Sequence, residues 1–526
     1  MRPLAFALIS ALLAPSHALF PNVPKVFLDL AVVYGRRDNG VDQYMGIKFA
    51  DAPRFKLPVP VANYIGTINA TSDGASCPQQ KFSATPDVPL FPIPELISED
   101  CLNLNVFVPQ GTKRTAKLPV VVYINGGAFQ TGSAEYYNAT GVTRLLRSVK
   151  LGMPTIHVAM NYRVSAWGFL TGKEVEAEGA ANFGLYDQRA AIQWVNKYIS
   201  AFGGDPSRVT LNGESAGSIS VTFQMLAFGG NYQNLFQGVF SQSGAILPSP
   251  TMEFPKGQAL FDFLAAQTGC GNALNKLACL RTVPLSVLTD AVDKTPDIFS
   301  YSGGAVSWIP TIDGKFIPES PYQLVLDGKF APVPLVTGVM DDEGTMFSLQ
   351  QTNLTTDEDF RTWIRTYWFP DATAAELEPL WTAYPPNPAD GSPFDTGDAN
   401  QLYPQFKRVS AFQGDALFQA PRRYLTQNLP RQFKTWVYQS KRSKDTQFLG
   451  SFHGSDLFLG FLDDYLINFA YNGNPNVNGT VFWPQYTRDN QTMYTFRDGG
   501  DNYLAQDDYR KDSMANLTSI FMKYPL

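Results

Sequence analysis

The 526-residue sequence contains little histidine, little cysteine and no strong excess of either charge. Its three histidines and four cysteines show no CxxC or HExxH spacing, so we expect no metal site. The formal net charge of −6 and the lack of a strongly basic run argue against nucleic acid or an anionic membrane surface as a partner. After the first residues, no apolar run reaches the roughly 18 residues of a membrane-spanning helix, and we expect no such helix.

The N-terminal segment predicts secretion. It reads MRPLAFALISALLAPSHALF, in which one arginine precedes an apolar stretch and Ser16-His17-Ala18 offers a small-residue cleavage site. We therefore expect residues 1–18 to be a signal peptide and 19–526 to form a single domain, because no repeat, low-complexity tract or obvious linker interrupts the rest. The tail, which ends SIFMKYPL, carries no apolar anchor signal.

Secretion changes how the cysteines are interpreted, because disulfide bonds persist in oxidising compartments. Of the three pairings that four cysteines allow, two sequential bridges are the simplest, and they would join Cys77 to Cys101 and Cys270 to Cys279. Asn-x-Ser/Thr triplets also suit a secreted glycoprotein. The candidate N-glycosylation sites are Asn69, Asn138, Asn353, Asn478, Asn490 and Asn516.

The order of strand and helix patterns predicts an α/β fold. Residues 26–70 alternate apolar and polar residues around turns, which predicts short antiparallel strands. Continuous apolar, β-rich runs predict strands buried on both faces at 118–126, 155–163 and 208–213, with further strands at 332–339 and 434–439. Helical spacing is found at 186–204, 357–367, 403–428 and 505–523. We expect a large, mostly parallel central sheet flanked by helices, with a small N-terminal antiparallel sheet.

The stretch TLNGESAGSIS places Ser215 between two glycines, after a predicted buried strand and before a predicted helix. In this context the G-x-S-x-G pattern is typical of a nucleophile held on a sharp turn, where side chains at Gly213 and Gly217 would crowd the backbone. The N–H groups at the start of the helix would point toward developing negative charge. We therefore interpret Ser215 as a nucleophile.

A serine hydroxyl needs a base to accept its proton, and the chain after the signal peptide has two histidines. His157 lies inside an apolar strand pattern and is interpreted as a buried structural residue. His453 lies in the loop LGSFHGSDLF after a predicted strand, where this architecture places functional groups, and is the expected base.

A carboxylate must orient the base, and the sequence VTGVMDDEGTMF offers three directly after a predicted strand. Spacing alone does not choose among Asp341, Asp342 and Glu343. Donors for an oxyanion are expected from the N–H of Ala216 and from the glycine-rich turn YINGGAF, residues 123–129.

Several long blocks resemble the type-B carboxylesterase/lipase family of α/β-hydrolases, which includes secreted fungal lipases, sterol esterases and carboxylesterases. The resemblance runs from YMGIKFADAPRF to DDYRKDSMANLTSIF and includes SEDCLNLNVFVP, NYRVSAWGFL and NFGLYDQRAAIQWVNKYISAFGGDPSRVTLNGESAGS. It implies an α/β-hydrolase fold and both cysteine pairings above. It also implies the roles of nucleophile, acid and base for Ser215, Glu343 and His453, and of oxyanion donors for Gly127, Ala128 and Ala216.

The resemblance further implies structural ion pairs of Arg54 with Glu99 and Arg163 with Asp187, and a supporting serine, Ser243, near the acid. One segment departs from the family. The 78–100 loop inside the first disulfide is short for a lipase lid, is rich in proline, and lacks the tryptophan with which cholinesterases bind choline. Its apolar stretch, 88–97, could cover an acyl pocket or contact lipid, whereas cholinesterase activity is not expected.

The expected function is a secreted serine ester hydrolase that cleaves apolar carboxylic esters through an acyl-enzyme and uses no cofactor. Its partner would be a small-molecule or lipid ester, with transient contact to a lipid interface. An aryl or hydroxycinnamate (feruloyl) esterase on the same scaffold is the alternative. A non-catalytic binding protein and a peptidase are remoter ones. The sequence leaves the acyl length and the alcohol part of the substrate open.

Overall fold

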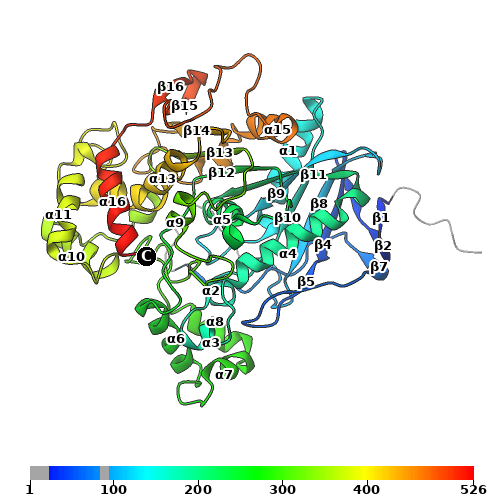
Figure 1. The fold of residues 1–526 in the computed structure, drawn as a ribbon, viewed down its shortest axis with the longest axis horizontal. Helices are drawn as coiled ribbons and strands as arrows, with labels where there is room; N and C mark the ends of the chain where they lie inside the picture. Colours follow the sequence, from blue (N-terminus) through cyan, green and yellow to red (C-terminus); the bar gives the residue numbers. More distant parts are fainter. Residues whose placement is uncertain (1–22, 83–93) are drawn as a thin grey trace, which may run out of the picture.

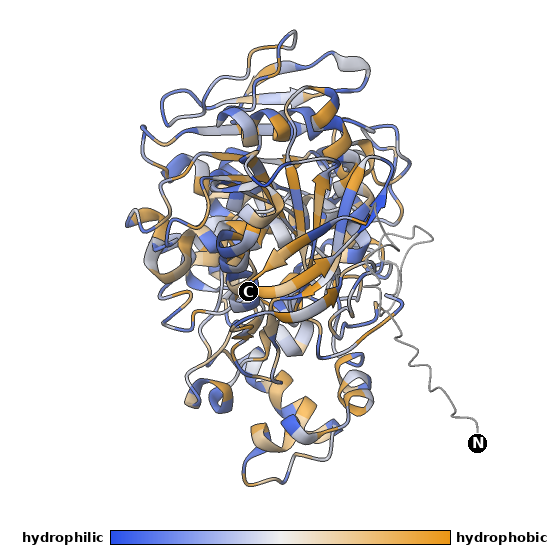
Figure 2. Ribbon diagram, turned by 90° about the vertical axis from the view of Figure 1, so that its right-hand side faces the viewer, coloured by the Kyte–Doolittle hydropathy of each residue, from blue (hydrophilic) through white to orange (hydrophobic). Residues whose placement is uncertain are grey.

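The structure is a computed structural model that describes residues 23–82 and 94–526. The predicted signal peptide, 1–18, and part of the apolar stretch 88–97 lie outside the described residues. Figure 1 shows a broad sheet through the middle of the molecule with helices on both sides. In Figure 2 the central strands carry mainly hydrophobic residues, as expected for strands covered on both faces.

The main sheet has eleven strands in the order β16-β15-β14-β13-β12-β11-β9-β10-β8-β4-β3. The strands from β15 to β10 are parallel, and β16 at one end and β8, β4 and β3 at the other are antiparallel to their neighbours. Their bounds are Arg36–Asp38 (β3), Val41–Lys48 (β4), Asn103–Pro109 (β8), Leu118–Ile124 (β9), Ile156–Met160 (β10), Gly204–Glu214 (β11), Gly238–Gln242 (β12), Leu335–Met340 (β13), Thr435–Ser440 (β14), Thr492–Phe496 (β15) and Tyr503–Gln506 (β16).

Alternate residues of the parallel strands enter two separate cores. Val120 and Val122 of β9 belong to the larger apolar cluster, whereas Val121 between them belongs to the cluster that contains Phe469 of α15. The helices α4 (Phe183–Tyr198) and α5 (Ala216–Gly230) cover the first face. The helices α1 (Asn138–Lys150) and α15 (Asp463–Asn472) cover the second.

The small N-terminal sheet is present but is not wholly antiparallel. It contains β1 (Lys25–Leu28), β2 (Leu30–Tyr34) and β7 (Ile65–Asn69), and only the β1–β2 pair is antiparallel. After β2 the chain contributes β3 and β4 to the main sheet before it returns, so β7 runs in the same direction as β2. The short strands β5 (Ala50–Asp51) and β6 (Val59–Pro60) pair with each other.

The helix predicted at 505–523 begins later, because residues 503–506 form β16 and pair with β15; α16 spans Lys511–Lys523. The helix predicted at 403–428 is α12 (Phe406–Gly414), a π-helical turn (Asp415–Gln419) and α13 (Ala420–Asn428) in succession. No helix of the described chain has the length and apolar character to cross a bilayer. The other α-helices are α2 (Ser165–Phe169), α3 (Lys173–Ala177), α6 (Pro255–Gln267), α7 (Lys276–Thr282), α8 (Leu285–Val292), α9 (Pro321–Leu326), α10 (Asp357–Tyr367), α11 (Ala374–Ala383) and α14 (Ser455–Leu459).

Candidate active site

Ser215 occupies the turn between β11 and α5. Its backbone lies at φ 57° and ψ −126°, a conformation that L residues rarely adopt. A Cβ atom on Gly213 would lie 2.3 Å from the carbonyl oxygen of Gly217, and one on Gly217 would lie 2.0 Å from the carbonyl oxygen of Ile124. Both glycines are therefore required for the turn to pass between its neighbours, as the pattern predicts.

Glu343 and His453 meet behind this turn. Glu343 lies three residues after the end of β13, and its Oε2 is 2.5 Å from Nδ1 of His453. The other oxygen, Oε1, accepts a hydrogen bond of 2.7 Å from the backbone N–H of Met340. Of the three acids that spacing left open, Glu343 is therefore the one that contacts the histidine.

Both side chains are buried, with exposed fractions of 1% for Glu343 and 6% for His453. Burial lowers the pKa of His453, but the carboxyl groups of Glu343 and Glu214 raise it by more, so the net pKa lies above its ordinary value. Nε2 of His453 lies 3.3 Å from Oε1 of Glu214. Among the described residues, no hydrogen bond joins Nε2 to the hydroxyl of Ser215, although both side chains line the same cavity.

That cavity has a volume of about 300 Å³ and is mostly apolar. It brings Ser215 and His453 together with Gly127, Ala128 and Ala216, the expected oxyanion donors. The other lining residues are Phe129, Tyr136, Tyr137, Thr140, Glu214, Ile219, Leu247, Ile298, Phe299, Gly304, Val306, Ile309, Met346, Phe347, Leu417, Phe418, Gly454, Leu457, Phe458 and Leu526.

The glycine-rich turn after β9 has an unusual backbone. Gly127 lies at φ 109°, and Ala128 lies at φ 56°, in the left-handed region that alanine rarely adopts. The carbonyl of Gly127 accepts hydrogen bonds from the N–H groups of Gln130 (2.9 Å) and Thr131 (3.0 Å). Ala216 is the first residue of α5, where a backbone N–H has no acceptor within the helix.

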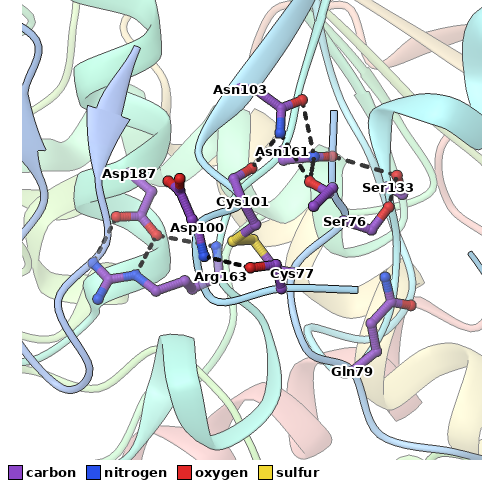
Figure 3. The surroundings of a disulfide bond; sticks show 12 residues. Ser76, Cys77, Gln79, Asp100, Cys101, Asn103, Ser133, Asn161, Arg163 and Asp187 are labelled. Atoms are coloured by element: carbon purple, nitrogen blue, oxygen red, sulfur yellow. Dashed lines mark hydrogen bonds and ion pairs between the residues drawn. A yellow bond between two sulfur atoms is a disulfide. The ribbon is translucent and has the colours of Figure 1, made fainter. Parts of the chain in front are cut away.

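The start of the 78–100 loop is hydrogen-bonded to the segment that follows this turn. A disulfide joins Cys77 to Cys101, and a second joins Cys270 to Cys279. Next to the first disulfide, Gln79 Nε2 donates to the carbonyl of Gly132 at 3.0 Å. Figure 3 shows Gln79 and the first disulfide together with Ser76, Ser133, Asn103 and Asn161, and with the ion pair of Arg163 and Asp187. The loop thus starts from a rigid, hydrogen-bonded support.

Other expected supporting residues have defined partners. Arg54 Nη2 lies 2.6 Å from Glu99 Oε2, and Arg163 Nη2 lies 2.7 Å from Asp187 Oδ1. The backbone N–H of Ser243 donates to the carbonyl of Gly338 in β13, the strand that leads to the acid, whereas its buried hydroxyl has no hydrogen-bond partner among the described residues.

His157 lies in the interior of β10 with an exposed fraction of 3%, beside the rings of Phe107 and Tyr123. Burial lowers its pKa to about 3, so it is neutral at physiological pH. The described residues contain no group of three His, Cys, Asp or Glu side chains arranged to hold a metal ion.

Two further acids of the site were missed in the sequence. Burial raises the pKa of Glu214 to about 8 and that of Asp456 to about 6. Asp456 Oδ2 accepts a hydrogen bond of 2.7 Å from Gln242 Nε2, so this acid contacts the end of β12. Both lie close in the sequence to predicted site residues. Glu214 directly precedes Ser215, and Asp456 lies three positions after His453. Their short separation from the motif residues is the signal that could have found them.

Comparisons with known proteins show which family the chain resembles over nearly its whole length. Residues 22–513 match the sequence model of the carboxylesterase family. Secreted lipase 1 of Botryotinia fuckeliana (strain B05.10) is 38% identical over 94% of this chain and 92% of its own length. The secreted triacylglycerol lipase LIP1 of Gibberella zeae is 37% identical over 91% of this chain and 87% of its own length.

Among solved structures, the crystal structure of Aspergillus niger EstA superimposes with a TM-score of 0.82 at 26% sequence identity. The match covers 96% of this chain and 99% of EstA. The mostly parallel eleven-stranded sheet is thus that of an α/β-hydrolase, as the sequence predicts. On these matches, which span nearly its whole length, the chain belongs to the carboxylesterase family.

Proposed function

We propose that the chain is a secreted serine ester hydrolase that cleaves apolar carboxylic esters, in particular acylglycerols, through an acyl-enzyme. The observation that carries this proposal is the cavity of about 300 Å³, whose apolar walls meet at Ser215 and His453. The carboxylate of Glu343 contacts the other nitrogen of the imidazole ring and completes the arrangement of nucleophile, base and acid. The secreted lipases among the relatives support secretion and a lipid ester as substrate.

The reaction begins with attack by Ser215 on the ester carbonyl carbon. As the bond forms, Nε2 of His453 takes the hydroxyl proton, and Glu343 holds the ring in the required tautomer and stabilises its charged form. Because hydrogen bonds of a site without substrate are often long, we expect Nε2 to turn from Glu214 to Ser215 when the ester binds.

The carbonyl oxygen becomes an oxyanion, which the backbone N–H groups of Gly127, Ala128 and Ala216 would bind. His453 then gives its proton to the departing alcohol and leaves an acyl group on Ser215. Water hydrolyses this acyl-enzyme by the same route. Every step uses groups of this chain.

Contact with a lipid surface is the finer part of the proposal. Phe458 belongs to the cavity lining and is also 64% exposed, so its ring lies at the cavity mouth. Leu459 beside it is 39% exposed, and Leu96, on the described end of the 78–100 loop, is 61% exposed. An exposed aromatic ring at the mouth of an apolar cavity, with further exposed apolar side chains on the same helix and on the 78–100 loop, suits a substrate that is presented by a lipid aggregate. We propose a transient contact of this kind.

We propose the same division of the chain as the sequence predicts, with a signal peptide at 1–18 and a single domain at 19–526. The single domain is supported by the sheet, because residues 36–38 and 503–506 form strands of the same sheet, and distant parts of the chain therefore share one core.

Glycosylation is proposed at the exposed sequons, Asn69, Asn353, Asn478, Asn490 and Asn516. Asn138 is only partly exposed. Its amide donates to Asp73 at 2.8 Å and accepts from Asn105 at 2.9 Å, so its side chain is occupied.

The test is kcat/KM on p-nitrophenyl esters from acetate to palmitate, with Ser215→Ala and His453→Ala as blanks. Each substitution should lower kcat by about four orders of magnitude or more while the circular-dichroism spectrum is retained. A maximum at long acyl chains, with turnover of triolein emulsions, supports the lipase assignment. A maximum at acetate or butyrate, with turnover of methyl ferulate, replaces it by a carboxylesterase or feruloyl esterase.

The stacked rings of Phe299, Phe347 and Phe418 near the cavity are the observation that favours an aromatic acid part as the second candidate. Full ester turnover by Ser215→Ala would overturn the mechanism. An unmodified protein that hydrolyses no ester and whose Ser215 resists an organophosphate would be a binding protein instead, and turnover of casein would indicate a peptidase.

A further inference from the structure

The contact between Glu343 and His453 joins two loops that the sheet alone does not hold together. Strands β13 and β14 are paired up to Met340 and Ser440. Glu343 follows its strand closely, whereas His453 is separated from Ser440 by a long connection. A hydrogen bond of 2.5 Å at the end of that connection requires a further attachment between the two loops.

Asp342, the residue before Glu343, provides this attachment. Its backbone N–H donates to the carbonyl of Ser451 at 2.9 Å, and its Oδ2 accepts from the N–H of Ser451 at 2.8 Å. Backbone and side chain of one acid therefore both bind a residue two positions before His453. Asp342 has an exposed fraction of 0%, so water does not compete for these bonds.

The same carboxylate is held by three more donors. Lys444 Nζ donates to Oδ2 at 2.7 Å, and Oδ1 accepts from Ser392 Oγ at 3.0 Å and from the N–H of Phe394 at 2.8 Å. With Ser451, these donors come from three separate segments of the chain. Hydrogen bonds to an ionised acceptor are the strong class, so a buried carboxylate with four of them is firmly fixed.

The packing around the carboxylate is equally close. Gly450 lies at φ +61°, and a Cβ atom there would be 2.3 Å from Oδ2 of Asp342. A second attachment lies beside it, because Thr345 Oγ1 donates to the carbonyl of Leu449 at 2.8 Å. The segment 449–451 therefore lies directly against the Glu343 turn.

We propose that Asp342 is a positioning residue: it holds the segment 449–453 against the Glu343 turn and thereby sets the contact between Glu343 and His453. The inference rests on the proposed function, because its consequence for turnover requires His453 to be the base. A displacement of about 1 Å in such a group can cost about 100-fold in rate. Asp342 does not touch substrate, so its loss should lower kcat and leave KM nearly unchanged.

The neighbouring acid offers a matched control. Asp341 is also buried, at 3% exposed, and it shares Lys444, whose Nζ lies 2.8 Å from its Oδ2. Its Oδ1 accepts from Gln439 Nε2 at 2.9 Å, so it binds the β14 strand. No hydrogen bond in the described chain joins the Asp341 side chain to residues 449–453. Asp341→Asn therefore removes a comparable buried charge without releasing the His453 loop.

The experiment compares Asp342→Asn and Asp341→Asn with the unmodified protein. Each carboxylate oxygen of Asp342 accepts two hydrogen bonds. In Asp342→Asn, an NH₂ group replaces one of these oxygens, so two donors then face a donor and are repelled. We expect kcat to fall about 100-fold in Asp342→Asn, with KM little changed. Asp341→Asn should keep a kcat close to that of the unmodified protein.

A structural readout accompanies the kinetics. A short hydrogen bond to Glu343 strongly deshields the Nδ1 proton of His453, and ¹⁵N-histidine labelling detects it with His157 as the internal reference. This signal should shift or disappear in Asp342→Asn and stay in place in Asp341→Asn. A stable Asp342→Asn protein with unchanged kcat and an unchanged proton signal would overturn the proposal.

Should Asp342→Asn fail to fold, Ser392→Ala decides, because it keeps the carboxylate and removes one of its donors. A fall in kcat of about two- to tenfold with a shifted Nδ1 signal supports the role of Asp342, and no change in either overturns it.

Ser215→Ala separates the two proposals. If that variant stays fully active, the proposed function fails; if it is inactive while Asp342→Asn behaves like Asp341→Asn, only the positioning role fails.

Discussion

Oε1 of Glu214 lies 3.3 Å from Nε2 of His453, the ring nitrogen that receives the proton of Ser215 in the proposed mechanism. The other ring nitrogen lies 2.5 Å from Glu343, so the imidazole stands between two buried carboxyl groups. Against the effect of burial, these two acids raise the pKa of His453. Ionised Glu214 therefore acts on the imidazole from the Nε2 side, and it is ionised above its own pKa of about 8.

Glu214→Gln should leave the acid limb of the kcat/KM profile in place. Burial raises the pKa of Glu214 to about 8, so in the acid range its carboxyl group is neutral, as the glutamine amide is. A base must be neutral to accept a proton, and the pKa of His453, which sets the acid limb, is then not changed by the loss of a charge. The profile is measured on a soluble p-nitrophenyl ester, with Glu378→Gln on the exposed face of α11 as control. An acid limb that moves by about one pH unit or more would contradict the expectation.

The same substitution should change how stability depends on pH. Burial raises the pKa of Glu214 from 4.5 to about 8, so between these values the folded protein holds a proton that the unfolded chain has lost. The contribution of Glu214 is complete below the lower value and is lost as the pH rises through the higher one. Because glutamine does not titrate, the Glu214→Gln variant does not lose stability in this way as the pH rises. Its melting temperature should rise relative to that of the unmodified protein between pH 5 and pH 8.

The sequence predicts the nucleophile turn because all of its signals are local. A buried strand, two glycines and a helix lie within a few positions of Ser215, and the two glycines are required by contacts of 2.3 and 2.0 Å. The acid could not be chosen by spacing, because three neighbouring acids face different partners: Asp341 faces Gln439, Asp342 faces Ser451 and Glu343 faces His453. Those directions depend on the packing of distant strands.

The same distinction explains the errors in the fold. The strand predicted at 118–126 is present as Leu118–Ile124, and the helix predicted near 357–367 has those bounds, because both patterns are long and uniform. Strand β16 has four residues, and what makes it a strand is its pairing with β15, which its own sequence does not encode. In the N-terminal sheet, alternation indicates strands but not direction, and the excursion through the main sheet makes β7 parallel to β2.

Gly217→Ala should disturb both stability and turnover. The added methyl group would lie 2.0 Å from the carbonyl oxygen of Ile124, a backbone atom that cannot rotate away. Overpacking of this kind costs about 1–3 kcal/mol, and here it also moves the turn that carries Ser215. Gly271→Ala is the control, because its Cβ would have its nearest neighbour at 3.4 Å, an ordinary contact. Equal urea midpoints and equal kcat values for the two variants would contradict the prediction.

Leu526 should set the length of acyl chain that the cavity accepts. Its side chain lines the cavity, is 8% exposed, and is held in place by the hydrogen bond of its N–H to the carbonyl of Pro248 at 3.0 Å. Leu526→Ala enlarges the cavity and should move the optimum of the p-nitrophenyl ester series to longer acyl chains, whereas Leu526→Trp should move it to shorter ones. Leu326→Ala, at the exposed end of α9, should leave the optimum unchanged. Shifts of both Leu526 variants in one direction would refute the assignment.

Asp507→Asn should be strongly destabilising. Asp507 and Arg422 are fully buried, and Arg422 Nη2 donates to Asp507 Oδ1 at 3.0 Å. Arg423 Nη2 donates to the same oxygen at 2.8 Å. Removing the carboxylate charge leaves two arginines inside the protein without their counterion. The free energy of unfolding, from urea titration, should fall by about 3–5 kcal/mol.

The pH dependence of this loss of stability, and a control variant at an exposed ion pair, test the prediction further. Burial raises the pKa of Asp507, but Arg422 and Arg423 lower it by more, so the net pKa lies below its ordinary value of 3.8. Its contribution is therefore present above that value and is lost only as the pH falls through the lower, folded-state pKa. The difference between Asp507→Asn and the unmodified protein should stay constant from neutral pH to about pH 5 and shrink only in stronger acid. Asp489→Asn, which breaks the exposed pair with Arg431, should change stability by less than about 1 kcal/mol. If the two variants were equally stable, the buried cluster would not be what holds β16 and α13 together.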